Sequence, residues 1–296
     1  MLKSLLYYVF KVIIWFSSKL SDKNLYRCSN IIKVVLYNLL GYRKQVVIKN
    51  LRMSFPVKSA AEIALLAEKY YQHLSDLIME TLASYSWSRE KLATHFKFTN
   101  LGVLQPYLEQ KKRMVGVSAH FGNFEIGAIL IPSQLKVPGY AIYRPLANPK
   151  LEQWMYKKRT RSGLTIVPSK ELRPMIEKMS SPGILFLLAD QNPSIVQKAY
   201  WVNFLNRDTA FVHGPANVAK EHNMPILFFD SKRVKRGYYE SEISVLVDDP
   251  TKYTHQQITE MFAKKLEHIL QERPDDWLWS HKRWKWAKIN EEIVRI

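Results

Sequence analysis

The feature that most constrains the fold of this chain is a change in its hydrophobic pattern near residue 112. From there on, short apolar runs alternate with longer stretches of helical character. Such alternation predicts an α/β fold with a central, largely parallel or mixed sheet flanked by helices. The last predicted strand alternates polar and apolar residues, which favours an edge or antiparallel position. The predicted strands are Met114–Ala119, Tyr140–Tyr143, Ile184–Ala189, Ile226–Asp230 and Tyr239–Val247, and the predicted helices are Phe124–Leu130, Pro149–Ser162, Glu171–Met179 and Pro215–His222.

The part of the chain before residue 112 is predicted to be helical. Residues 2–16 are largely apolar but are interrupted by Lys11. As a helix they cover roughly 22 Å, whereas the hydrocarbon core of a bilayer is about 30 Å thick. This helix is predicted to be a membrane anchor, which either spans by including residues 17–20 or lies in the interface; an ordinary core helix is the alternative. We therefore divide the chain into an anchor at 1–20, a helical region packing on the core at 21–111, and an α/β core at 112–290.

The charge of the chain restricts its partners. Lys and Arg number 44 and Asp and Glu 26, so the formal net charge is +18. Such an excess attracts anionic lipids, acidic proteins or nucleic acid. An aromatic content of 12 % favours a lipid interface, and no zinc-finger, helix-turn-helix or RNA-binding signature supports nucleic acid. The single cysteine, Cys28, excludes an intramolecular disulfide and fits a reducing compartment.

A histidine and a carboxylate follow the first predicted strand, in the stretch 118–125, which reads SAHFGNFE. Gly122 suits a tight turn, and Asn123 is a good helix N-cap. Side chains five positions apart on one helix diverge by about 140°. His120 and Glu125 can therefore act together only if His120 lies in the loop and Glu125 in the first helical turn, within hydrogen-bond reach. Such a pair suits general-base chemistry. The H-E-x-x-H zinc spacing is absent, so no metal is predicted.

Polar residues also follow two other predicted strands. Arg144 comes after Tyr143, where a guanidinium could bind phosphate or carboxylate, and Asn148-Pro149 marks the start of the next helix. Asp190 and Gln191 follow Ala189. A carboxylate beside an amide there is suited to orient or hydrogen-bond other groups in a cleft shared with the other motifs. In α/β proteins the carboxyl ends of the strands form the usual binding crevice. These residues are therefore predicted to gather near His120.

The C-terminal segment 277–286 interleaves four Trp with four Lys, Arg or His residues. This composition suits a membrane interface or an acidic partner. Cation–π stacking inside the fold is the alternative.

Taken in order, these motifs resemble the late acyltransferases of lipid A biosynthesis, the lauroyl/myristoyl transferase family. By this resemblance His120 is the catalytic base and Glu125 its partner. Arg159 and Asp190 are implied as further catalytic residues, and Arg144, Asn123 and Gln191 as substrate-binding residues. The fold implied is the α/β fold of glycerolipid acyltransferases. The matching motifs are Arg52 to Phe55-Pro56, His120 to Glu125, Tyr143-Arg144-Pro145 with Asn148-Pro149, the basic helix with Arg159, Ala189-Asp190-Gln191, and Trp277 to Lys285.

The resemblance also implies a reaction and a location. An acyl group would pass from the thioester of acyl carrier protein, the co-substrate, to a hydroxyl of a lipid A precursor at the cytoplasmic face of the inner membrane, without a further cofactor. Lysophospholipid or other lysolipid acyltransferases are the nearest rival, although their motif more often ends in aspartate. A non-catalytic basic protein that binds membranes or nucleic acid explains the charge, but not three polar motifs at strand ends.

Overall fold

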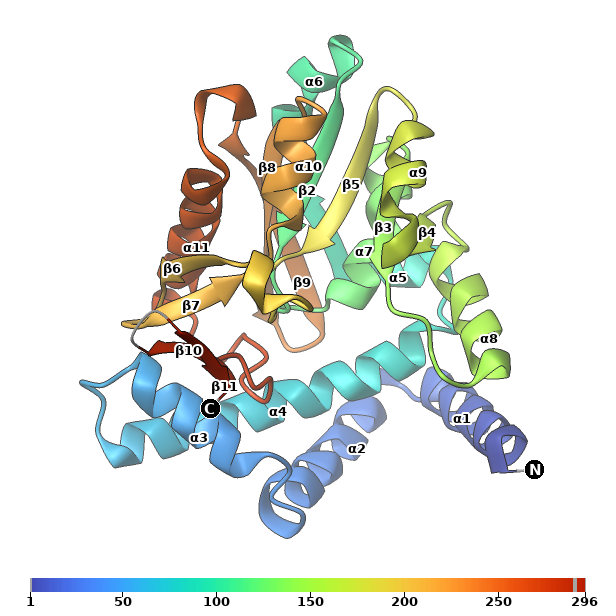
Figure 1. Cartoon of the computed structure of the whole chain (residues 1–296). Helices are drawn as coiled ribbons and strands as arrows, with labels where there is room; N and C mark the ends of the chain where they lie inside the picture. Colours follow the sequence, from blue (N-terminus) through green and yellow to red (C-terminus); the bar gives the residue numbers. More distant parts are fainter. Residues whose placement is uncertain (1, 290–291, 296) are drawn as a thin grey trace.

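A seven-stranded sheet forms the centre of the computed structural model, which describes residues 2–289 and 292–295 (Figure 1). Its strand order is β1-β9-β8-β2-β5-β3-β4. Strand β2 pairs in parallel with β5 and β8, β3 pairs in parallel with β5 and β4, and β9 pairs antiparallel with β8. The predicted mixed sheet and the antiparallel last strand are thus confirmed. The strands are β1 (Phe96–Thr99), β2 (Arg113–Ser118), β3 (Gly139–Tyr143), β4 (Thr165–Pro168), β5 (Gly183–Leu188), β8 (Ile226–Lys235) and β9 (Tyr238–Val247).

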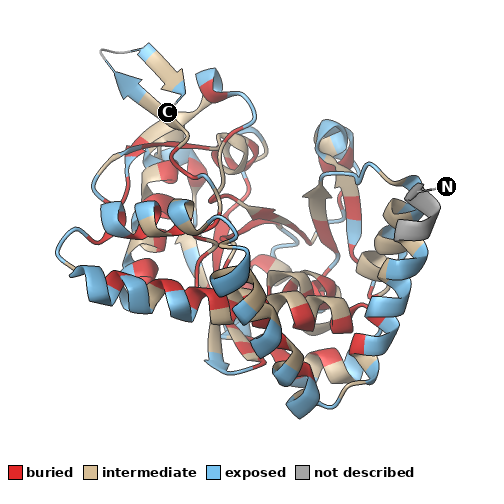
Figure 2. Ribbon diagram, turned by 90° about the horizontal axis from the view of Figure 1, so that it is seen from below, coloured by how far each residue is buried: buried red, intermediate tan, exposed pale blue. Residues whose placement is uncertain are grey.

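Both faces of the sheet are covered, which explains why the central strands read as continuous apolar runs. Along β2, Val115 and Val117 belong to one hydrophobic cluster, and Met114 belongs to the other. The first cluster contains residues of α10 (Gly214–Glu221) and α11 (His255–Glu272). The second contains residues of α5 (Arg89–His95), α6 (Gln105–Glu109) and α7 (Phe124–Leu135). Figure 2 shows stretches of buried residues along the strands and on parts of the surrounding helices.

Local signals set the ends of several helices. Ser59 and Glu62 form the reciprocal bonds of a capping box at the start of α4 (Ala60–Ser84), and Thr254 with Gln257 does the same for α11. Asn148 caps α8 (Pro149–Thr160), with Pro149 at its first position. Helix α9 (Leu172–Glu177) is shorter than the predicted 171–179. Short helical turns lie at Leu101–Leu104, Ser169–Glu171, Val196–Lys198 and Pro250–Lys252.

The N-terminal region is a layer of helices packed around α4. Helices α1 (Leu2–Lys19), α2 (Asp22–Val34) and α3 (Lys44–Ser54) all contact α4, and a π-helical turn, Val35–Leu39, follows α2 (Figure 1). Strand β1 lies within the region predicted as helical and pairs with β9. The sheet therefore begins before residue 112, because a four-residue strand after a helix is too short to show a period of its own.

Besides β1, two hairpins and the edge strand β4 were not predicted. The hairpins are β6 (Tyr200–Asn203) with β7 (Asp208–Phe211), and β10 (Trp286–Ile289) with β11 (Glu292–Arg295). Strand β4, the other edge of the main sheet, also has only four residues. Each of these strands is held by its pairing rather than by a local apolar pattern.

Helix α1 has one packed face and one exposed apolar face. Ile14 and Ser17 are buried, whereas Val12 and Trp15 are 64 % and 62 % exposed. Within the described residues, no helix has both the length and the apolar character needed to cross a bilayer. Of the two predicted modes of anchoring, spanning and interfacial, the spanning one is thus not supported. The exposed large apolar side chains of this helix are Tyr8, Val9, Val12, Ile13, Trp15 and Phe16.

Candidate active site

The pairing of β2 with β5 brings His120 and Asp190 together. Ser118 lies opposite Leu188 in the parallel register, and each of the two functional residues follows its strand by two positions. His120 Nδ1 lies 2.7 Å from Asp190 Oδ1, and the backbone N–H of His120 donates to Asp190 Oδ2 at 3.0 Å. Asp190 is only 1 % exposed. Two neighbouring strand ends thus form an imidazole–carboxylate pair, as in general-base sites.

The two groups shift each other's pKa in opposite directions. Burial alone would lower the pKa of His120, but the charge and hydrogen bond of Asp190 outweigh burial, and Glu125 adds to their effect. The pKa of His120 is therefore raised. Burial alone would raise the pKa of Asp190, but the charge and hydrogen bonds of His120 and a bond from Trp277 hold it below its ordinary value. Asp190 is thus anionic at neutral pH and stabilises a protonated His120.

The second ring nitrogen of His120 lies next to the side chain of Gln191. With Nδ1–H donated to Asp190, Nε2 carries the lone pair, and the side-chain Nε2 of Gln191 lies 3.1 Å from it. The His120 side chain keeps 16 % of its surface exposed, and the ring packs edge-on against Phe124. His120 Nε2 can therefore accept a proton from a group that takes the place of the Gln191 amide. Gln191, predicted to bind substrate, therefore contacts the imidazole of His120.

Glu125 does not hydrogen-bond His120, which corrects the predicted pairing. The geometry of the loop is as predicted, because His120 precedes α7 and Glu125 lies in its first turn. The Glu125 carboxylate instead accepts from Arg159 Nε at 3.0 Å and Nη2 at 2.5 Å, and from the Tyr85 hydroxyl at 3.3 Å. The start of α7 directs Glu125 towards α8 and α4, whereas the parallel register supplies Asp190 to the imidazole.

The turn between His120 and α7 packs against Ser231 and is hydrogen-bonded to Glu80. Gly122 has φ +58°, and a Cβ atom there would lie 3.1 Å from the side chain of Ser231, so glycine is favoured at this position. Asn123 is the predicted N-cap, since its Oδ1 accepts from the backbone N–H of Ile126. Its Nδ2 donates to the buried carboxylate of Glu80 at 3.0 Å. Asn123 is 1 % exposed. Its polar atoms therefore hold the loop, which does not fit the predicted role in substrate binding.

Two arginines, the partly buried Arg159 and the exposed Arg144, belong to the predicted site. Burial alone would lower the pKa of Arg159, but the charge of Glu125 and their hydrogen bonds raise it. Arg159 is thus a fixed cation in a two-bond ion pair. Arg144 directly follows β3, the neighbour of β5, and is exposed. Arg144 therefore lies at the carboxyl-terminal edge of the sheet, as predicted, whereas Arg159 comes from α8 and contacts this edge through Glu125.

Three tryptophans of the Trp-rich segment are buried inside the fold, and one of them, Trp277, contacts the site. Trp277, Trp279 and Trp284 are buried. Trp277 Nε1 donates to Asp190 Oδ2 at 2.7 Å, and the guanidinium of Arg207 stacks on Trp284 at 3.6 Å. The prediction of a membrane or acidic-partner surface at this segment is therefore wrong for these three rings, and stacking inside the fold is correct. The contact of Trp277 with Asp190, 87 residues away in sequence, leaves no local signal, and the same holds for Tyr85 with Glu125.

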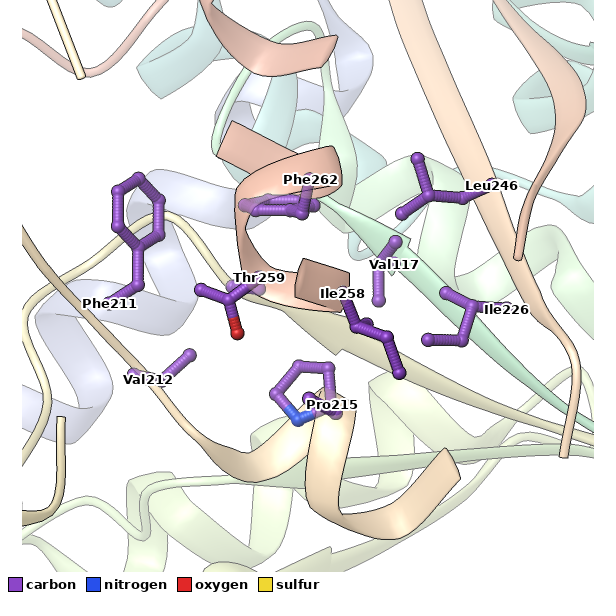
Figure 3. Close-up of a pocket in the computed structure, with 11 residues that line it drawn as sticks. Val117, Phe211, Val212, Pro215, Ile226, Leu246, Ile258, Thr259 and Phe262 are labelled. Atoms are coloured by element: carbon purple, nitrogen blue, oxygen red, sulfur yellow. The ribbon is translucent and has the colours of Figure 1, made fainter. Parts of the chain in front are cut away.

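The apolar cavity behind the site is too small for a substrate. It lies between the sheet and helices α10 and α11 (Figure 3) and has a volume of about 20 Å³, roughly the space of one water. Its one hydroxyl, on Thr259, is bonded to the carbonyl of His255. It is a small gap in the hydrophobic core, next to the carboxyl ends of β2 and β5. The lining residues are Val117, Ala189, Phe211, Val212, Pro215, Ala216, Ile226, Leu246, Ile258, Thr259 and Phe262.

Comparison with known proteins gives a consistent result. The family model described as bacterial lipid A biosynthesis acyltransferase matches residues 1–286. The lipid A biosynthesis acyltransferase of Haemophilus influenzae is 26 % identical over 82 % of this chain and 78 % of its own length. The lipid A biosynthesis lauroyltransferase of Escherichia coli is 22 % identical over 92 % of this chain and 89 % of its own length. The palmitoleoyltransferase of the same organism is 22 % identical over 87 % of this chain and 83 % of its own length.

Proposed function

This chain belongs to the bacterial lipid A biosynthesis acyltransferase family, and we propose that it transfers a fatty acyl group from acyl carrier protein to a hydroxyl of a lipid A precursor. The observation that carries the mechanism is the bond between His120 Nδ1 and the buried carboxylate of Asp190. A histidine held in this way has one tautomer, with its free lone pair on Nε2. It is therefore prepared to take a proton from a hydroxyl.

The proposed reaction needs no covalent enzyme intermediate. His120 Nε2 removes the proton of the acceptor hydroxyl as the oxygen attacks the thioester carbonyl. The tetrahedral intermediate then expels the carrier thiolate, which takes the proton back from the imidazolium and leaves as a thiol. Asp190 stabilises the imidazolium between the two transfers, since its charge lies 2.7 Å from Nδ1. The acceptor hydroxyl displaces the Gln191 amide from Nε2 when it binds.

Arg159 is proposed to supply positive charge near the reacting carbonyl. Its bonds to Glu125 fix the guanidinium in one orientation at a side-chain exposure of 22 %. A cation fixed beforehand stabilises a developing oxyanion better than one that must reorganise. Glu125 is therefore proposed to act mainly by holding Arg159, while its charge also favours protonated His120. Arg144, exposed at the end of β3, is proposed to contact the anionic part of a substrate.

Arg159→Lys is expected to lower kcat/KM by roughly 10- to 100-fold, because lysine keeps the charge but cannot make two parallel bonds to one carboxylate. Steady-state kinetics with an acyl carrier protein donor measures the effect. Arg173→Lys, an exposed change in α9, is the control and should leave kcat/KM unaltered. Equal activities of the two variants would contradict the role given to Arg159.

The surface of the chain suits the proposed partners. A net charge of +18 favours both acidic acyl carrier protein and anionic lipid. The exposed apolar face of α1, with Trp15 and Phe16, is suited to lie in the membrane interface parallel to its plane. We therefore place the enzyme on the cytoplasmic face of the inner membrane, held by an interfacial helix.

Lipid A analysis tests the function directly. Mass spectrometry of lipid A from cells that lack this protein should show the loss of one acyl chain, and the purified protein should restore it from an acyl carrier protein thioester. Unchanged lipid A together with altered phospholipids would reject the proposed acceptor and indicate a lysophospholipid acyltransferase.

A further inference from the structure

The indole of Trp277 contacts the catalytic carboxylate from a distant part of the chain. Its N–H donates to Asp190 Oδ2 at 2.7 Å, and the residue is 3 % exposed. It reaches this place from the loop after α11. Neither the family resemblance nor the comparisons assign it a role.

The contacts of Asp190 show what this bond does. Oδ1 accepts from the His120 ring, and Oδ2 accepts both from the His120 backbone N–H and from Trp277. Because Oδ2 is held from two directions, the carboxylate has one rotational position, and Oδ1 stays on Nδ1. Without the indole donor, a single backbone bond would hold Oδ2.

Trp277 is itself held rigidly. An antiparallel bridge joins its backbone to Phe121, the residue after His120. Its ring lies edge-on to Phe204, Trp279 and Trp284 at centroid distances of 6.0, 4.9 and 6.0 Å. Because the indole is fixed, its N–H determines the orientation of the Asp190 carboxylate that accepts from it.

We propose that Trp277 is a positioning residue of the acyl-transfer site, whose indole N–H holds Asp190 in the orientation that aligns His120. This inference rests on the proposed function. It gives the C-terminal Trp-rich segment a part in catalysis, because the segment supplies a contact that neither the β2 nor the β5 loop provides.

The matched pair Trp277→Phe and Trp284→Phe tests the proposal. Each change removes one buried indole N–H from the same aromatic cluster, but Trp284 donates to Thr209 Oγ1 at 2.8 Å and not to Asp190. Trp277→Phe is expected to lower kcat by about tenfold or more, because the carboxylate of Asp190 would no longer be held in one orientation, and to leave the acceptor KM unchanged. The acid limb of its pH–kcat profile should move to lower pH, because a less well placed Asp190 supports the imidazolium less. Trp284→Phe should keep kcat within about twofold and the limb in place.

Two outcomes distinguish this inference from the proposed function. If the wild type is active and the two variants have the same kcat and the same acid limb, the role of Trp277 is overturned but the proposed function is not. A wild type with no transfer to a lipid A precursor overturns the proposed function. In an Asp190→Asn background, Trp277→Phe should cause little further loss of kcat, and a full second loss would show that Trp277 does not act through Asp190.

A measurement on the wild-type fold does not depend on activity or on the stability of Trp277→Phe. In protein labelled with ¹⁵N-tryptophan, the Trp277 indole resonance should titrate with the midpoint of His120 and lose this response in Asp190→Asn. An indole resonance that stays constant while His120 titrates would contradict the proposal.

Discussion

His120→Ala is expected to lower kcat by about a thousandfold, or ~4 kcal/mol in transition-state stabilisation, because it removes the proposed proton acceptor. The assay measures transfer from an acyl carrier protein thioester to a lipid A precursor under saturating substrate. His268→Ala is the control, since this side chain is 64 % exposed and pairs with Glu272 on the surface of α11. His120→Ala with kcat similar to that of His268→Ala would reject His120 as the base.

Asp190→Asn is expected to have an effect of comparable size, about a hundredfold to ten-thousandfold in kcat. The amide has the size of the carboxylate but cannot stabilise the imidazolium by charge. It can also present an N–H to Nδ1, which would favour the wrong tautomer of His120. Asp208→Asn, at an exposed position in β7, should change kcat little.

The pH profile of Asp190→Asn tests whether Asp190 raises the pKa of His120. The base must be neutral to accept a proton, so activity rises as pH passes upward through the pKa of His120. Asp190 raises that pKa, and burial alone lowers it. Removing the Asp190 charge should therefore move the acid limb to lower pH while the plateau falls. A limb that stays in place, or moves to higher pH, would show that Asp190 is not the group that supports protonated His120.

The pairing of His120 with Asp190, and not with Glu125, shows the limit of reading local spacing. Glu125 is five positions from His120, and its place in the first turn of α7 was predicted. Asp190 is 70 positions away but lies opposite His120 because β2 and β5 are parallel neighbours in register. Proximity along the chain and the family resemblance thus both gave Glu125 as the partner of His120, whereas the structure places Asp190 there. The family resemblance implied Asp190 and Arg159 as catalytic residues but not which side chain each contacts.

The sequence by itself determined the fold class, the strands that carry the site and several helix ends. These features depend on periodicity, on capping side chains such as Ser59 and Thr254, and on the turn at Gly122, all of which are local. Only the tertiary structure decided the register of β2 against β5, the burial of the Trp-rich segment and the short strands held by pairing. Those depend on contacts between residues far apart in the chain. The same contacts place Trp277 on Asp190, because the final loop packs against strand ends formed by earlier parts of the chain.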